Sequence, residues 1–295
     1  NMKLILPKSL IWIPESTVEE LLKYYDYPHP EKKGEIISGY DKGHVIRTAK
    51  MSAVVAKYLG HNEKIIYEYQ ISCFLHDLGR AGLDQKLFGE IWSWAKNNNI
   101  PTRPLEWRKR YPDTIYGKET EAFLDMFSSK LRNIGIENVD WTKEQVEMRL
   151  GYARRFKRQM KRIKPKLKKQ DIEWKDWMEK VVLYYYYPEK MNSAPAWTRE
   201  LGEILVACEQ LEAYSNRNRG NDYYNRGEES FSEALGYLNK LMNEGRIGKA
   251  VLLMLRKLLA NGLFDDILKD ARDGNISKEE LDYLRSINAE ENVCQ

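Results

Sequence analysis

The stretch HVIRTAKMSAVVAKYLGHNEKIIYEYQISCFLHDLGR, residues 44–80, has a strong helical periodicity. An apolar stripe runs along its first half, formed by Ile46, Ala49, Ala53 and Ala56. Gly60 is a natural end for that helix, Asn62 is a suitable cap for the next one, and Gly79 is a natural stop for the second. We therefore expect two antiparallel helices joined by a short turn.

The same periodicity continues beyond this hairpin. Thr198 is expected to cap a helix over 199–215, and further helices are expected over 231–261 and 277–287, the last with a capping box of Ser277 and Glu280. Prolines and asparagines predict a loop over 97–113, and a second loop is expected over 216–230. No series of alternating strands is seen, so the predicted fold class is all-α.

Composition restricts the class of protein. The chain has 295 residues, 42% of them hydrophobic, and a net charge of only +4. Its three cysteines are far apart in the sequence, so they form neither a disulfide framework nor the ligand spacing of a zinc site. This pattern suggests a reducing compartment. The apolar start is interrupted at Pro7, and no stretch approaches the ~20 apolar residues of a membrane span. We expect a cytoplasmic protein without a membrane partner.

A polar pair at the end of the hairpin needs an explanation. His76 and Asp77 follow an apolar helix, where burying them costs free energy unless they bind something. His44 begins the preceding helix, and an antiparallel hairpin brings that start beside the end of the next helix. Imidazole and carboxylate ligands suit Mn, Fe, Co, Ni or Zn better than Ca. A divalent metal site is therefore predicted here.

These segments resemble a known family. GHVIRTAKMSAVVAKYLG (43–60) followed by FLHDLGRAGLD (74–84) looks like the HD superfamily of metal-dependent phosphohydrolases. That family adds a distant acidic ligand on a later helix, and ACEQLEAYSNR (207–217) is similar to it. The resemblance implies an HD-domain-like helical bundle and a divalent cofactor (Mn, Fe, Co, Ni or Mg). The implied ligands are His44, His76, Asp77 and Glu209, with Glu212 as a rival to Glu209.

The downstream sequence narrows the resemblance. SFSEALGYLNKLMNEGRI (230–247) is similar to the HD-GYP subgroup, whose members hydrolyse cyclic dinucleotides with additional histidine ligands. This chain has no histidine after His76, lacks the G-Y-P signature, and has Tyr184 to Tyr187 where a His-His pair is expected. We read these tyrosines mainly as packing residues. The prediction is a degenerate member with a reduced, mononuclear site.

Three residues are assigned to the chemistry that this resemblance implies. Asp77 is a metal ligand that can also accept a proton from water, and Arg80 and Arg47 are candidates to neutralise a phosphate. Arg217 is a weaker candidate. The expected reaction is phosphoester hydrolysis in a phosphorylated small molecule or nucleotide. The alternative is a catalytically silent HD-GYP-like domain that binds a nucleotide or a protein partner.

One segment of the chain is strongly basic, and it lies in a candidate insertion of the predicted domain. The run 154–169 holds ten Lys and Arg residues and no acid, and Pro165 should kink or end its helix. We favour a solvated helix docked on the domain, and the alternative is a nucleic-acid surface. The predicted units are an N-terminal extension (1–34), an HD-like domain (35–265) in which 114–180 is a candidate basic helical insertion, and a C-terminal helical tail (266–295).

Overall fold

The computed structural model describes residues 4–216 and 230–287, and these residues are mainly helical. The helices are α1 (Glu15–Lys23), α2 (Lys42–Tyr58), α3 (Glu63–Leu75), η1 (Leu78–Arg80), α4 (Gln85–Asn97), α5 (Pro104–Arg110), α6 (Glu119–Arg132), α7 (Asp140–Leu150), α8 (Tyr152–Lys168), α9 (Asp176–Val182), η2 (Pro188–Met191), α10 (Ala196–Ser215), α12 (Phe231–Asn243), α13 (Lys249–Ala260), α14 (Asp265–Ala271) and α15 (Lys278–Ser286). Two short strands, β1 (Tyr27–Pro28) and β2 (Ile36–Ile37), pair antiparallel. The predicted all-α class is confirmed.

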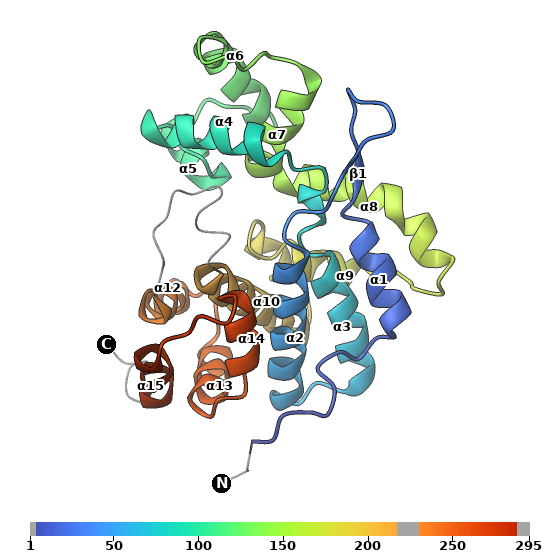
Figure 1. Cartoon of the computed structure of the whole chain (residues 1–295), viewed down its shortest axis with the longest axis vertical. Helices are drawn as coiled ribbons and strands as arrows, with labels where there is room; N and C mark the ends of the chain where they lie inside the picture. The colour runs from blue at the N-terminus through green and yellow to red at the C-terminus, as the bar shows by residue number, and fades with distance from the viewer. Residues whose placement is uncertain (1–3, 217–229, 288–295) are drawn as a thin grey trace.

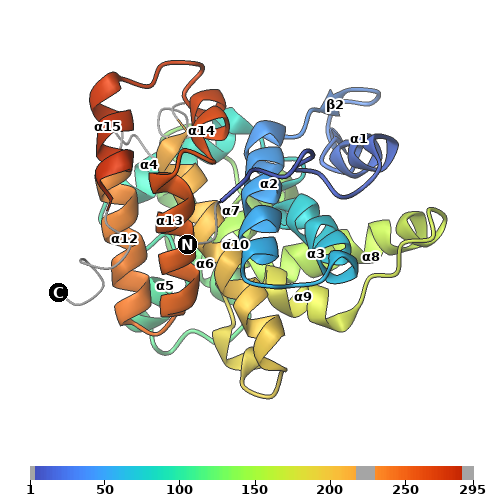
Figure 2. The same ribbon diagram turned by 90° about the horizontal axis from the view of Figure 1, so that it is seen from below.

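The helices enclose two separate hydrophobic cores. The larger core takes buried residues from both ends of the described chain, from Ile13 to Ile287. The smaller core is formed within Leu83–Leu150, and α4 to α7 gather around it at one end of the molecule (Figure 1). Seen from below, α2, α10 and α13 lie side by side in the larger unit (Figure 2). The second core thus begins and ends earlier in the chain than the insertion that the sequence placed at 114–180.

The predicted hairpin is present, and local capping explains it. Asp41 accepts a hydrogen bond from the amide of His44 at 3.0 Å, and Asn62 accepts one from the amide of Ile65 at 2.9 Å. Gly60 has a positive φ of 94°, as a residue that ends a helix often does. α2 packs against α3 along its length, and α10 packs against α2.

Gly79 does not end α3 as predicted. The helix ends at Leu75, and Gly79 lies in the η1 turn, where a Cβ atom would stand only 2.5 Å from the ring of Tyr152. The absence of a side chain at this position therefore makes room for an aromatic ring from α8.

Other helix boundaries also differ from the predictions. α10 begins at Ala196 after Pro195, so Thr198 lies inside the helix instead of capping it. The expected loop 97–113 contains α5, which begins at Pro104 because proline suits the first helical position. The helical patterns expected over 231–261 are present as two helices, α12 and α13. The capping box of Ser277 and Glu280 is confirmed, and the loop expected over 216–230 lies almost entirely outside the described residues, with Arg217.

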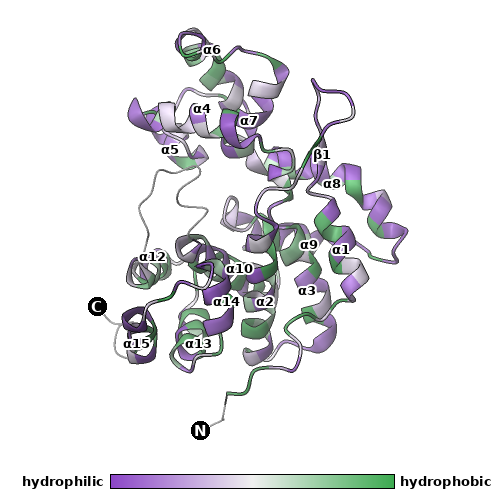
Figure 3. Cartoon of the chain, in the orientation of Figure 1, coloured by the Kyte–Doolittle hydropathy of each residue, from purple (hydrophilic) through white to green (hydrophobic). Residues whose placement is uncertain are grey.

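α8 carries the basic run and is docked on the larger core. Its apolar face is buried, through Phe156, Met160, Ile163 and Leu167. The helix continues through the exposed Pro165 to Lys168, so this proline does not end it. Arg154 and Arg158 pair with glutamates of α7, and hydrophilic colours dominate the outer end of α8 (Figure 3). This arrangement agrees with the favoured interpretation of a docked, solvated helix.

Among the described residues, no helix has the length and apolar content needed to cross a membrane.

Candidate metal centre

Three helices bring the predicted metal residues together. His44 lies in the first turn of α2, His76 is the residue that ends α3, and Glu209 lies on α10. Each offers a ligand atom, and these atoms lie within 4.8 Å of one another. Both imidazoles are buried, so the two rings face each other away from bulk water. The neighbouring positions of His44 and His76 agree with the hairpin prediction.

The two imidazoles are held so that their unprotonated nitrogens converge. Nδ1 of His44 contacts the carboxylate of Glu212, and Nδ1 of His76 lies 2.6 Å from the carbonyl oxygen of Cys73. Both partners accept hydrogen bonds, so Nδ1 carries the hydrogen in each ring, and Nε2 of a neutral ring then carries a lone pair. The two Nε2 atoms are 3.2 Å apart. Such a pair is repulsive unless a proton or a cation lies between the two nitrogens.

Glu212 supports His44 from outside the group. Its carboxylate is fully buried and also accepts hydrogen bonds from Arg47 at 2.9 Å and from Asn216 at 3.1 Å. Asn216 also donates a hydrogen bond to the carboxylate of Asp41, at 2.8 Å. This bond joins the end of α10 to the start of α2. A carboxylate on the far nitrogen of a histidine fixes the tautomer of the ring and raises its basicity. In this arrangement Glu209 groups with the histidines, whereas Glu212 orients one of them.

Asp77 is not part of this group. Its Oδ1 atom accepts a hydrogen bond from Arg80 at 2.6 Å, and the Arg80 guanidinium lies 5.4 Å from the centre of the Tyr152 ring. Burial and the nearby charge of Asp77 raise the pKa of Tyr152 well above its ordinary value. Tyr152 therefore keeps its proton and donates a hydrogen bond of 2.5 Å to the carbonyl of His76. The roles of Asp77 as a metal ligand and proton acceptor stay predictions.

Arg47 lies among carboxylates instead of in an open site. It is 9% exposed, and besides Glu212 it contacts Asp270 at 2.8 Å. These charges outweigh the cost of burial and raise the pKa of Arg47. Arg47 is absent from the residues that line the cavity described next. Its contacts fit a structural ion-pair partner of Glu212 better than a phosphate ligand.

Two hollows adjoin the group. A crevice of about 10 Å³, roughly the space of one water molecule, is lined by His76, Asp77, Tyr186 and Glu209 among others. A cavity of about 330 Å³ opens beside it and shares Tyr186 and Glu209 with the crevice. This volume is typical of small-molecule sites. Glu209 therefore connects the candidate metal centre to a space large enough for a ligand.

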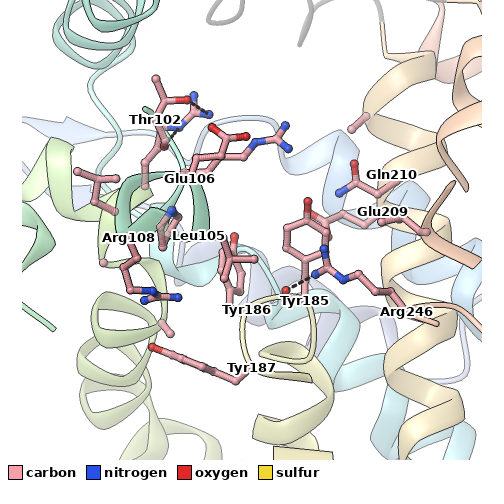
Figure 4. Close-up of a pocket in the computed structure, with 18 of the residues that line it drawn as sticks. Thr102, Leu105, Glu106, Arg108, Tyr185, Tyr186, Tyr187, Glu209, Gln210 and Arg246 are labelled. Carbon is pink, nitrogen blue, oxygen red and sulfur yellow. Dashed lines mark hydrogen bonds between the residues drawn. The ribbon is translucent and has the colours of Figure 1, made fainter. Parts of the chain in front are cut away.

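The cavity lies between the two cores. In Figure 4, Leu105 and Arg108 of α5 stand on one side, Glu209 and Gln210 of α10 stand on the other, and three tyrosines lie between them. These are Tyr185, Tyr186 and Tyr187. Tyr184, by contrast, is buried and donates a hydrogen bond to the carbonyl of Arg246 at 2.9 Å. The packing interpretation thus describes Tyr184, whereas the following three tyrosines line a cavity.

The cavity lining is rich in positive charge. Its cationic side chains are Arg80, Arg103, Arg108, Arg149, Arg154, Lys240 and Arg246, and its carboxylates are Glu106, Glu209 and Glu244. Buried Glu119 holds two of the arginines, accepting from Arg108 at 3.2 Å and from Arg154 at 2.9 Å. An excess of cations beside aromatic rings suits an anionic ligand with an aromatic part.

Sequence reasoning named the three residues that converge, His44, His76 and Glu209, but missed most of the cavity. Arg103 and Arg108 fall in the segment read as a loop, and Arg246 lies between α12 and α13, in a span where only helical patterns were noted. Arg154 was noticed only as part of the basic run. The one usable signal was the tyrosine run, whose rings do line the cavity.

Comparison with known proteins identified no relative: no family model, no curated protein and no solved structure matches this chain.

Proposed function

We propose that the protein is a metal-dependent phosphohydrolase with a mononuclear site formed by His44, His76 and Glu209. The substrate would be a nucleotide-like phosphoester bound in the adjoining cavity. The observation that carries this proposal is the 3.2 Å approach of two Nε2 atoms whose partners at Nδ1 leave lone pairs facing each other. A shared cation relieves that repulsion.

The donor set fits a catalytic metal. Two histidines and one carboxylate are a ligand set seen in catalytic zinc sites, which keep a further position open for water or substrate. Each histidine also has the outer hydrogen-bond acceptor that metal-ligating imidazoles usually have. A divalent ion bound there would lower the pKa of a water molecule and polarise a phosphoryl oxygen.

The surrounding residues have roles that need no metal. Arg80 lines the cavity and is oriented by Asp77, so its guanidinium can neutralise a phosphate that approaches Glu209. The rings of Tyr185 and Tyr186 offer apolar faces to a base. Because Tyr186 and Glu209 line both hollows, a phosphate at the junction lies beside the metal group while the rest of the ligand occupies the cavity.

The test is metal-stimulated phosphoester hydrolysis by the full chain. Bis(p-nitrophenyl) phosphate and a panel of nucleotides would be assayed with Mn²⁺, with Fe²⁺ and with EDTA. We expect Glu209→Gln to lower the metal-dependent rate by roughly 100-fold or more, since it removes a ligand. Glu244→Gln, a change in the same cavity but outside the metal group, should leave the rate within about twofold. Equal rates in both variants, or no stimulation by any metal, would refute the proposal.

One observation favours the second candidate, a catalytically silent domain that binds a nucleotide. Asp77 is held by Arg80, and the crevice beside His76 has room for about one water molecule. A silent domain would bind nucleotides equally well in EDTA and with Mn²⁺, and would release no product with either. The hydrolase requires turnover that disappears in EDTA.

A cytoplasmic location belongs to the same proposal. Cys73 and Cys208 are free and buried, and burial raises the pKa of the Cys208 thiol to about 12. Thiols in this state are unreactive, which is compatible with a reducing compartment.

A further inference from the structure

Helix α8 carries four lysines in a row that the docking of the helix does not use. Lys157, Lys161, Lys164 and Lys168 follow one another at intervals of four, three and four residues, so they lie along one side of the helix. All four side chains are exposed. Within residues 4–216 and 230–287, no carboxylate forms an ion pair with any of them. We call these four residues the lysine row.

The arginines of α8 differ from the lysine row because they bind neighbouring elements. Arg155 and Arg158 both donate to the carboxylate of Glu144, at 2.8 and 3.1 Å. Arg162 donates to the backbone carbonyl of Tyr24 at 3.1 Å. The guanidinium groups thus attach the helix to the rest of the protein, whereas the ammonium groups of the lysine row extend into solvent.

The spacing of the lysine row matches a regular line of negative charge. An α-helix rises about 16 Å between Lys157 and Lys168. One strand of a nucleic-acid duplex carries a phosphate about every 3.4 Å along the axis, so the row spans about five phosphates. Like charges one helical turn apart repel each other. Phosphates beside the row would replace that repulsion with attraction.

The apolar side of α8 does not share this surface. Phe156, Met160, Ile163 and Leu167 are buried, and each immediately precedes a lysine of the row, so the two sides are about 100° apart around the helix axis. Among the exposed residues of α8, only Pro165 is apolar. An amphipathic helix binds a lipid surface by inserting its apolar face. In α8 that face is covered by the larger core, which favours a nucleic acid over a membrane.

We propose that the lysine row is a docking surface for the phosphate backbone of a duplex nucleic acid. Each ammonium group contacts a phosphate as a point charge. Contacts to phosphates alone carry no sequence information, so the binding does not depend on sequence and weakens as the salt concentration rises. The surface uses neither the metal group nor the cavity, and its test is independent of the proposed function.

The experiment measures binding of the full chain to a fluorescein-labelled DNA duplex of mixed sequence, by fluorescence anisotropy in EDTA at several salt concentrations. We expect the logarithm of the binding constant to fall with the logarithm of the salt concentration, with a slope of about −3 to −4, the value for four phosphate contacts. A variant with Lys157→Gln, Lys161→Gln, Lys164→Gln and Lys168→Gln should flatten this slope by about three to four units.

The matched control removes the same charge from four exposed lysines of α13, α14 and α15, by Lys249→Gln, Lys257→Gln, Lys269→Gln and Lys278→Gln. It should retain the affinity and the salt slope of the wild type. No binding by the wild type at low salt, an unchanged slope in the variant of the lysine row, or the same loss in both variants would overturn the proposal. So would a wild type that binds phosphatidylserine vesicles through the lysine row but does not bind the duplex.

Discussion

Two buried polar clusters in this molecule differ in whether hydrogen-bond acceptors face donors or face other acceptors. Around Glu119 and Glu147, carboxylates face cations: Glu119 accepts from Arg108 and Arg154, and Glu147 accepts from Arg154 at 3.0 Å and from Arg158 at 3.3 Å. Opposite charges that satisfy one another hold the smaller core against α8. We call this set the Glu119 network.

The second cluster, the candidate metal group of His44, His76 and Glu209, is matched differently. There the outer partners are complete, but the inner atoms are all acceptors that converge on one another. A network of donors and acceptors needs nothing further, whereas converging acceptors need a proton or a cation between them. From this difference we expect the direction of the lone pairs, and not burial of charge alone, to distinguish a metal site from a structural network. The predictions below test this difference.

The largest effect is expected from breaking the Glu119 network. Glu119→Ala leaves two arginines without their shared carboxylate and should lower the free energy of unfolding by about 3–5 kcal/mol, measured by urea denaturation. Metal content should not change. Glu121→Ala on the same helix is the control, because Glu121 has only loose surface contacts with Lys118 and Lys143 at 3.8 and 3.7 Å. A loss no larger than that of the control would show that the network is not structural.

A smaller effect is expected from the outer partner of the metal group. Glu212→Gln should weaken metal binding by about 10–100-fold, because a neutral amide fixes the His44 tautomer less firmly. The measurement is competition with a fluorescent chelator. Glu203→Gln is the control, since Glu203 is a buried glutamate of the same helix that pairs with Arg199 at 3.0 Å. If both variants bind metal as the wild type does, Glu212 does not support a ligand.

The smallest effect is a pH dependence of stability. Burial tends to raise the pKa of Glu119, but its backbone hydrogen bonds and the charge of Arg154 outweigh burial and lower it. A lowered folded pKa stabilises the protein above the ordinary glutamate pKa of about 4.3, and this contribution disappears as the pH falls through the folded value. Unfolding free energies measured from pH 7 to pH 3 should therefore decline less steeply in Glu119→Gln than in the wild type. Parallel curves would contradict this assignment.

The sequence predicted features that depend on local signals. The α2–α3 hairpin follows from the capping side chain of Asn62 and the positive φ of Gly60, and the closeness of His44 and His76 follows from the hairpin itself. Glu209 and Glu212 were both candidates because one helical turn separates them. Only packing against α2 and the direction of each carboxylate distinguish their places.

Features that depend on distant packing could not be read from the sequence. Gly79 was taken as a helix stop, but its role is set by Tyr152, which lies 73 positions further along the chain in α8. Arg103 and Arg246 line the same cavity although they lie beside different cores, and neither has a motif around it. Asp77 pairs with Arg80, and the metal-ligand role that the family resemblance assigned to Asp77 stays a prediction.

The central claim is that His44 and His76 share a metal ion, and metal content tests it directly. Elemental analysis would be carried out on the full chain, purified without chelator and then incubated with Mn²⁺, Fe²⁺ or Zn²⁺, for wild type, His76→Asn and His61→Asn. His61 is the matched control because its Nε2 atom pairs with Glu200 at 2.7 Å, away from the metal group. We predict about one ion per chain in the wild type and in His61→Asn, and none in His76→Asn. A wild type that takes up no metal, or equal metal in all three proteins, would contradict the account.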